Sequence, residues 1–265
     1  VREGAFTLEK AHTAAQEILV REAIDPAKLG EPFNQKDVLR DKQYAKDKEA
    51  GLERGASPHE RETIKLAKVL EVAVNAQINA GWFGPDVHTR PTSKYDDVEN
   101  KIDLIAEIDI HSQGLTAHVA LGMDVTYAQE LKGKISRIQG EIIKNELATV
   151  KYYQSQDGHF TGSLNDIPRL VIGVDEERAG IIAKAWYKKN PALKKDPLRE
   201  QILIELIDQC EAFANYADRM GSAKAAASYR RTKKLLLKVY GSEVTAQKRQ
   251  EFGKDKVFRQ LQILI

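Results

Sequence analysis

The sequence predicts an α/β fold, in which a mixed sheet is flanked by helices and extended by helices at both ends. Two neighbouring segments, residues 101–110 and 115–127, alternate apolar and polar side chains with the period of two that is typical of strands. Much of the remaining chain has apolar residues at helical spacing, and 42% of all residues are hydrophobic, enough to form a core. We expect a helical N-terminal extension over residues 1–56, an α/β core over 57–190 and a helical C-terminal region over 191–265, packed on the core.

Composition bounds the possible partners and the compartment. No apolar run approaches the roughly 20 residues that a membrane-spanning helix needs, so we expect no membrane partner. A net charge of +2 predicts no strong bulk attraction to nucleic acid, and any such attraction must come from local clusters of charge. The single cysteine, Cys210, cannot form an internal disulfide, which is typical of a protein of the reducing cytoplasm.

The first third of the chain reads as helical. Residues 6–54 are interrupted near Asp25–Pro26 and around Gly30–Pro32, and residues 35–54 carry six basic and five acidic residues with almost no apolar face. Such a segment is typical of a solvated helix or a mobile arm. Ser57, followed by Pro58 and Glu60, predicts a capping box that begins a helix running to about Asn79.

Other elements alternate along the rest of the chain. Residues 81–100 read as a loop with room for a short strand, and the tail at 261–265 reads as either a helix end or a strand. The remaining elements that the pattern predicts are helices at 128–145, 175–190, 197–217 and 222–240, and strands at 150–153 and 169–174.

The two alternating segments predict a hairpin with a definite register. If Ser112 and Leu115 flank a two-residue turn, cross-strand partners have numbers that sum to 227. Asp103 then lies opposite Asp124, with Cβ atoms about 5 Å apart. A slip of one residue would set apolar positions against polar ones, which disfavours other registers.

Two opposed carboxylates repel each other unless something neutralises them. Mg²⁺ is a hard cation that typically uses one or two protein carboxylates together with phosphate oxygens. Glu71, on the helix that begins after Ser57, falls within an apolar stripe and is a candidate third carboxylate, with a position at the edge of the stripe as the alternative. The alternative is a solvated acidic face, because Glu107 and Asp109 share the face of Asp103.

A helix with an inward Glu, a strand with Asp, a strand with Asp-x-x and a further helix together resemble the PD-(D/E)XK nuclease superfamily. The resemblance lies in residues 95–105, YDDVENKIDLI, and 121–126, LGMDVT, and it covers roughly residues 58–175. It implies a restriction-endonuclease-like core that holds Mg²⁺ or Mn²⁺ and hydrolyses phosphodiester bonds in DNA or RNA. By the resemblance, Asp103, Asp124 and Glu71 are catalytic, and the metal ligands are Asp103, Asp124 and the carbonyl of Val125.

The sequence departs from the family pattern at two points. Thr126 occupies the lysine position, and the resemblance implies that a lysine of the next helix substitutes for it, either Lys132 or, the one we favour, Lys134. The first strand of the family's three-stranded meander is visible only if it lies within residues 85–93. A solvated helix lysine is the alternative for both candidates.

A second charged feature lies near the C-terminus. The predicted helix at 222–240 carries six basic and no acidic residues, and Arg230, Arg231, Lys234 and Lys238 are candidate contacts to a nucleic-acid backbone. A basic solvent face is the alternative.

Several chemistries lack support. The histidines show no zinc-ligand spacing, and no phosphate-binding loop, dinucleotide fingerprint or serine-hydrolase elbow occurs. Trp82 and Trp186 are expected in packing, with base stacking as the alternative. Two functions compete with the nuclease: a catalytically inactive nucleic-acid-binding or scaffold protein of the same fold, and an unrelated α/β interaction protein.

Overall fold

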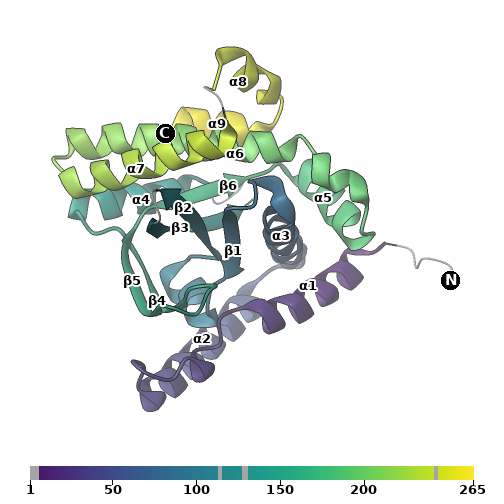
Figure 1. Ribbon diagram of the computed structural model, residues 1–265. Helices are drawn as coiled ribbons and strands as arrows, with labels where there is room; N and C mark the ends of the chain where they lie inside the picture. Colours follow the sequence, from purple (N-terminus) through teal and green to yellow (C-terminus); the bar gives the residue numbers. More distant parts are fainter. Residues whose placement is uncertain (1–5, 113–114, 127–130, 242–243) are drawn as a thin grey trace.

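The chain forms a mixed α/β structure, shown as a computed structural model in Figure 1. The structure describes residues 6–112, 115–126, 131–241 and 244–265, without the side chains of Glu53 and of 109–126. The helical elements are α1 (Leu8–Glu22), η1 (Pro26–Lys28), α2 (Gln35–Gly55), α3 (Pro58–Gln77), η2 (Ile78–Trp82), η3 (Asp96–Asn100), α4 (Leu131–Lys144), α5 (Glu176–Tyr187), η5 (Pro191–Lys195), α6 (Leu198–Arg219), α7 (Ala223–Tyr240), α8 (Ala246–Phe252) and α9 (Lys256–Leu264). The strands are β1 (Val87–Pro91), β2 (Leu104–Ser112), β3 (Leu115–Thr126), β4 (Ala148–Gln154), β5 (Thr161–Ile167) and β6 (Arg169–Gly173).

The main sheet has four strands in the order β1-β2-β3-β6. β1 and β3 run antiparallel to β2, and β6 runs parallel to β3. Leu104 pairs with Met123 and Ser112 pairs with Leu115, so the predicted register of the hairpin is confirmed. The tip at Gln113–Gly114 lies outside the described residues. β4 and β5 form a separate two-stranded hairpin.

Over residues 104–108, both faces of β2 are buried, each in a different hydrophobic core. Leu104, Ala106 and Ile108 join the larger core, which includes residues of α3, α4, α6 and α7. Ile105 joins a smaller core formed with residues of α2 and of the β4–β5 hairpin. Glu107, on the face of Ile105, is only 4% exposed, so the alternative of a solvated acidic face is wrong for this residue.

Side-chain amides protect the two outer edges of the sheet. Asn79 accepts from the backbone N–H of Thr89 in β1 and donates to its carbonyl, each at 2.8 Å. On the opposite edge, Gln209 of α6 accepts from the N–H of Val171 in β6 at 2.8 Å and donates to its carbonyl at 2.7 Å. Each amide takes the place of a further strand, which satisfies backbone groups that would otherwise be buried without partners.

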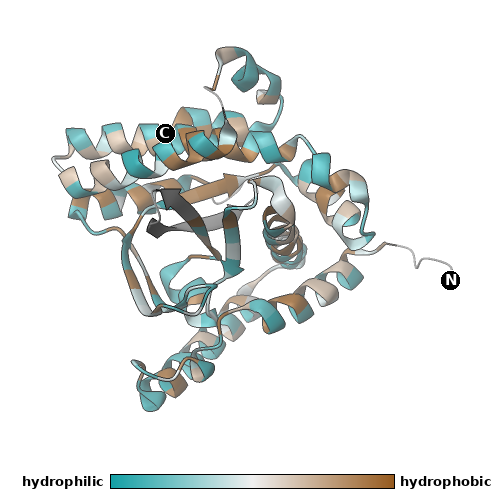
Figure 2. Ribbon diagram, in the orientation of Figure 1, coloured by the Kyte–Doolittle hydropathy of each residue, from teal (hydrophilic) through white to brown (hydrophobic). Residues whose placement is uncertain are grey.

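Helices surround the sheet. Figure 1 shows α6 and α7 side by side along one side of the sheet, with α3 and α1 elsewhere around it. In Figure 2, apolar residues concentrate on the interior elements α3 and β6, whereas α2 is largely hydrophilic. Trp82 is 2% exposed and donates its indole N–H to the carbonyl of Leu193, which confirms its packing role and excludes it from base stacking. None of the described helices combines the length and the apolar character that crossing a membrane requires.

The structure decides two open alternatives and adds one strand. Residues 35–55 form the helix α2, so the solvated helix is confirmed and the mobile arm is wrong, because Val38 and Ala45 are fully buried and Asp41 is 5% exposed. The strand β5 was not predicted, because its sequence TGSLNDI shows little apolar alternation. The tail is helical in α9, so the alternative of a terminal strand is wrong.

Candidate active site

The candidate site begins on α3, which the predicted capping box starts. The Ser57 hydroxyl accepts from the N–H of Glu60, and Glu60 accepts from the N–H of Ser57. Four turns along this helix, Glu71 is 4% exposed although it is a carboxylate. Lys68, one turn before it, donates to Glu71 Oε2 at 2.9 Å. The buried carboxylate therefore has a cationic partner on its own helix.

Asp97 is the second anion of this cluster, and it comes from η3 rather than from a strand. Lys68 Nζ lies 3.1 Å from Asp97 Oδ2, and Lys94 lies 3.3 Å from the same oxygen. The side chains of Lys68 and Asp97 are 23% and 21% exposed, so the pair is shielded but reachable from solvent. Lys94 is also paired with Glu49 of α2. We call Lys68, Glu71, Asp97 and Asp103 the acidic cluster.

Electrostatics in the acidic cluster fix the charge states. Burial lowers the pKa of Lys68, but the attraction of Glu71, Asp97 and Asp103 outweighs it, and the pKa lies well above its usual value. Burial raises the pKa of Asp97, but Lys68 and Lys94 outweigh it and hold the pKa at about 2. Burial raises the pKa of Glu71, and Lys68 offsets only part of that effect. Lys68 and Asp97 are therefore a charged pair at neutral pH.

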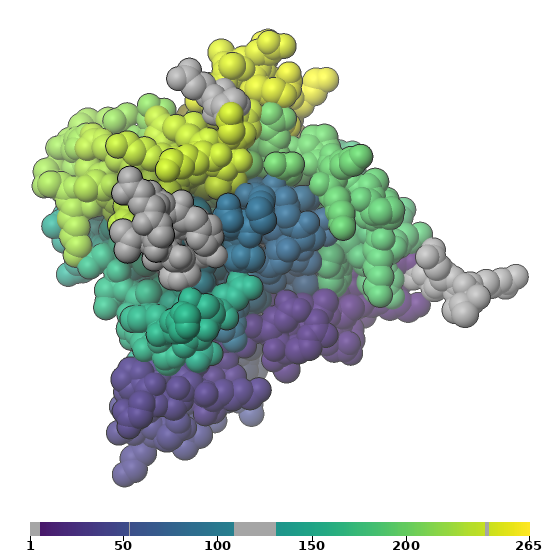
Figure 3. Space-filling view, viewed as in Figure 1, coloured from purple at the N-terminus to yellow at the C-terminus, as the bar shows by residue number. Residues whose placement is uncertain are grey.

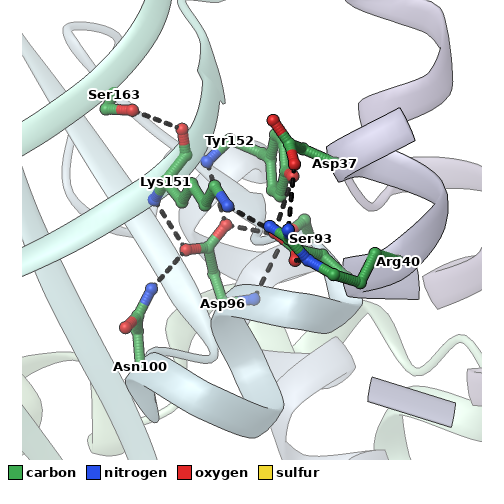
Figure 4. A network of polar contacts seen from close by, with 9 residues as sticks. Asp37, Arg40, Ser93, Asp96, Asn100, Lys151, Tyr152 and Ser163 are labelled. Atoms are coloured by element: carbon green, nitrogen blue, oxygen red, sulfur yellow. Dashed lines mark hydrogen bonds and ion pairs between the residues drawn. The ribbon is translucent and has the colours of Figure 1, made fainter. Parts of the chain in front are cut away.

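Asp96, whose polar contacts are drawn in Figure 4, is the residue directly before Asp97. It is fully buried and accepts from the hydroxyl of Ser93 and from the side-chain amide of Asn100. It also accepts from the backbone N–H groups of Lys151 and Tyr152 in β4, at 2.7 and 3.1 Å. This network ties η3 to β4, and the next residue, Asp97, then meets Lys68.

Hydrogen bonds accepted by the backbone carbonyls at and just before Asp103 fix its position. Arg169, 3% exposed, donates to the carbonyls of Asn100 and Lys101 at 2.7 and 2.5 Å. The N–H of Thr92 donates to the carbonyl of Asp103 at 3.0 Å. Asp103 is half-buried and comes directly before β2. The buried guanidinium of Arg169 therefore holds the loop that carries Asp103. The strand β2 begins one residue after Asp103.

The register of β2 and β3 bears on the predicted pair of Asp103 and Asp124. The β2–β3 ladder ends at the pair of Leu104 with Met123, so the predicted pair of Asp103 and Asp124 lies one position beyond its last pair. In β3, Asp124 and Val125 pair with Val171 and Ile172 of the parallel strand β6. The carboxylate of Asp124 lies outside the described side chains.

The capacity of this region to bind a metal ion depends on the carboxylate of Asp124. Among the described residues, no three His, Cys, Asp or Glu side chains are grouped closely enough to hold a metal ion. A metal centre in this region therefore needs a ligand such as Asp124 in addition to Asp103.

The remaining predicted site residues lie on α4 and α7. Lys132 is exposed and Lys134 is half-buried, both in the first turn of α4. On α7, Arg230 is ion-paired with Asp218, whereas Arg231, Lys234 and Lys238 are exposed and make no ion pair within the described residues. We call these three residues the basic stripe. Lys224 and Lys233 of the same helix pair with Asp166 and Glu211.

Two members of the cluster were missed at the level of sequence. Lys68 lies three residues before Glu71 and carried a recognisable signal, since a buried carboxylate on a helix needs a cation at i−3 or i−4. Asp97 stands in the YDDVEN run, where nothing in the spacing separates it from Asp96. Comparison of the chain with protein-family models, with curated proteins and with solved structures gives no match.

Proposed function

We propose that this protein is a divalent-metal-dependent nuclease with a PD-(D/E)XK-like core, which hydrolyses phosphodiester bonds in DNA or RNA. The observation that carries the proposal is the acidic cluster, in which Lys68 contacts Glu71 and Asp97 while the charge of Asp103 acts on it. Burying a lysine among three acids has a desolvation cost, and such groups concentrate at functional sites.

The order of elements supports the same assignment. A helix with an inward Glu, α3, precedes the antiparallel meander β1-β2-β3, and the helix α4 follows it. The first strand of that meander falls at Val87–Pro91, inside the interval that the resemblance requires. Asp103 stands directly before the second strand and Asp124 near the end of the third.

Lys68 is our candidate for the lysine that Thr126 replaces. It comes from α3 rather than from β3 or α4, and it already contacts the carboxylates of the cluster. A lysine held in this way would donate to a non-bridging phosphate oxygen and stabilise the charge that develops there. Lys134 remains the competing candidate from the sequence.

The residues present fit a hard cation. Asp103, directly before β2, and Asp124 of β3 would supply oxygen ligands, with the Val125 carbonyl next in the chain, and Mg²⁺ and Mn²⁺ prefer oxygen donors. When bound, such an ion polarises the phosphate and lowers the pKa of a coordinated water. Glu71, whose pKa is raised by burial, would hold or accept a proton beside Lys68.

Cleavage of labelled oligonucleotides tests the proposal. Single- and double-stranded DNA and RNA are incubated with the protein in Mg²⁺, in Mn²⁺ and in EDTA. The wild type should cut at least one substrate with metal and none in EDTA. Asp103→Asn and Asp124→Asn should slow cleavage by roughly 100-fold or more, because each removes a carboxylate that would hold the metal ion.

Asp47→Asn is the matched control, because Asp47 is an exposed acid of α2. It should cut like the wild type. A folded wild-type protein that cuts none of the four substrates, or Asn variants that cut at the wild-type rate, would contradict the proposal.

The basic stripe favours a second candidate function, a non-catalytic nucleic-acid-binding protein. Three exposed cations without ion-pair partners in the described chain follow one face of α7, and Thr126 leaves β3 without the usual lysine. This function predicts salt-sensitive binding that survives Asp103→Asn and Asp124→Asn, together with no cleavage.

A further inference from the structure

A pocket of about 650 Å³ lies beside the edge strand β1, between α1, α3 and the turn of the β4–β5 hairpin. Its lining includes Arg21, Glu22, His88, Arg90, Glu107 and Gln156. Figure 3 shows α1, the β1 region and the β4–β5 hairpin meeting on one face of the molecule. A volume of this size is typical of pockets that bind a small organic ligand.

The acids of this pocket already have partners. Glu22 accepts from Arg21 at 2.8 Å and from the side-chain amide of Asn75 at 3.4 Å. The buried Glu107 accepts from the N–H of Gln156 at 3.2 Å. Both carboxylates therefore already accept hydrogen bonds from donors of the protein.

The basic side chains of β1 are in the opposite situation. His88 and Arg90 are half-buried, alternate with the buried Val87, Thr89 and Pro91, and so share one face of the strand. Within the described residues, the side chain of Arg90 makes one long hydrogen bond, from Nε to the carbonyl of Glu22 at 3.4 Å, and no ion pair. His88 makes no hydrogen bond or ion pair there. The unmatched charge and donors of the pocket are thus those of Arg90 and His88.

The pocket adjoins the acidic cluster along two elements. Arg90 pairs with Ile105, which lies two residues beyond Asp103 on β2. Asn75 of α3 and Asn79 of η2 line the pocket about one and two turns after Glu71. A polynucleotide chain with one phosphate at the acidic cluster would therefore have its neighbouring nucleotide near this pocket.

We propose that this pocket binds a nucleoside monophosphate unit, with the phosphate on Arg90 and His88 and the nucleoside in the remaining space. The inference rests on the proposed function in taking the nucleotide to be part of the cleaved strand. An arginine guanidinium can donate two parallel hydrogen bonds to phosphate, which makes Arg90 the main determinant.

Calorimetric titration in EDTA separates this inference from cleavage. The probes are the four ribonucleoside 5′-monophosphates, the corresponding nucleosides and inorganic phosphate, because these distinguish recognition of a nucleotide from recognition of any anion. We expect saturable binding of at least one monophosphate with a Kd in the millimolar range or tighter. Its nucleoside and inorganic phosphate should each bind at least about tenfold more weakly.

Arg90→Gln should weaken the binding of the monophosphate at least about tenfold, because it removes the charged fork. Arg199→Gln, an exposed arginine of α6, should leave the binding unchanged and is the matched control. Melting curves establish that both variants are folded.

Each result has a distinct meaning. Arg90-dependent binding supports the pocket even if the wild type cuts no oligonucleotide, in which case only the proposed function fails. Absence of saturable monophosphate binding overturns the pocket even if the wild type cuts. Equal binding of nucleoside and monophosphate, or equal loss in Arg90→Gln and Arg199→Gln, also overturns it.

Discussion

Lys68 Nζ lies 3.1 Å from Oδ2 of Asp97 and so joins the middle of α3 to η3, 29 residues further along the chain. The same ammonium group contacts Glu71, and both carboxylates are largely shielded from water. One side chain therefore balances the charge of the acidic cluster and ties together the two elements that carry it.

Replacement of Lys68 by Met should destabilise the fold. It leaves Glu71 and Asp97 without their shared cation, and loss of one partner of a buried pair costs about 3 kcal/mol or more. Urea unfolding at pH 7 measures the change. Lys65→Met is the control, since Lys65 pairs with Glu9 and Glu62 on the surface and should have little effect. Equal stability of the two variants would contradict this role of Lys68.

The ion pair of Lys68 and Asp97 also predicts that stability depends on pH in the acid range. Asp97 has a pKa of about 2, lowered from 3.8, so its pairing stabilises the fold above pH 4 and is lost as the pH falls through about 2. We expect Asp97→Asn to reduce the free energy of unfolding by about 2 kcal/mol at pH 7 and to have almost no effect at pH 2. Urea titrations of both proteins across this range measure it. A difference that is the same at pH 7 and pH 2 would exclude the charged pair.

Because of Glu205 of α6, we expect the free energy of unfolding to fall, rather than rise, with pH at higher pH. It is 1% exposed, and burial raises its pKa from 4.5 to about 8. Because the folded state holds this proton and the unfolded state releases it, the free energy of unfolding should fall as the pH rises from about 4.5 to 8.

Glu205→Gln should remove that fall while keeping an acceptor for the N–H of Gly173, which Glu205 now binds. The variant should be more stable than the wild type by more than about 1 kcal/mol at pH 8, since one pKa unit corresponds to about 1.4 kcal/mol. The two proteins should match near pH 4. A variant that is less stable than the wild type at pH 8 would show that Glu205 is ionised when folded.

The basic stripe predicts a change in salt dependence. Replacing Arg231, Lys234 and Lys238 by Gln should lower the slope of log K against log salt for nucleic-acid binding by about 2 to 3. Replacing Lys224, Arg230 and Lys233 instead should lower it less, because each is already ion-paired. Fluorescence anisotropy at several salt concentrations measures both slopes. Equal slopes for the two triple variants would count against the stripe as the contact surface.

Periodicity and turn chemistry were enough to predict part of the fold. The alternation around Asp103 and Asp124 fixed the pairing of β2 with β3, because a one-residue slip would exchange buried and polar positions. The Ser57 capping box correctly began α3, because the cap is a local hydrogen-bond pattern. Glu71 interrupts an apolar stripe, which left open an edge position or an inward one, and its burial confirms the inward position.

Long-range partners set the limits of the prediction. Asp97 meets Lys68 only because the neighbouring Asp96 anchors η3 to β4, a contact between residues 55 positions apart. Arg169 similarly fixes the loop before Asp103 from 68 residues away. No local pattern encodes such contacts, and α2 looked unattached for the same reason, since Asp41 docks it through Lys151 and Tyr152.

Single-turnover cleavage by lysine variants tests the central claim most directly, namely that Lys68 acts on the phosphate beside Asp103. Cleavage is measured with protein in excess and at a temperature where melting curves show each variant folded. We predict that Lys68→Gln cuts at least about 100-fold more slowly than the wild type with little change in oligonucleotide affinity, whereas Lys132→Gln and Lys134→Gln cut at near wild-type rates. Wild-type cleavage by Lys68→Gln, or a comparable loss confined to Lys134→Gln, would contradict the claim.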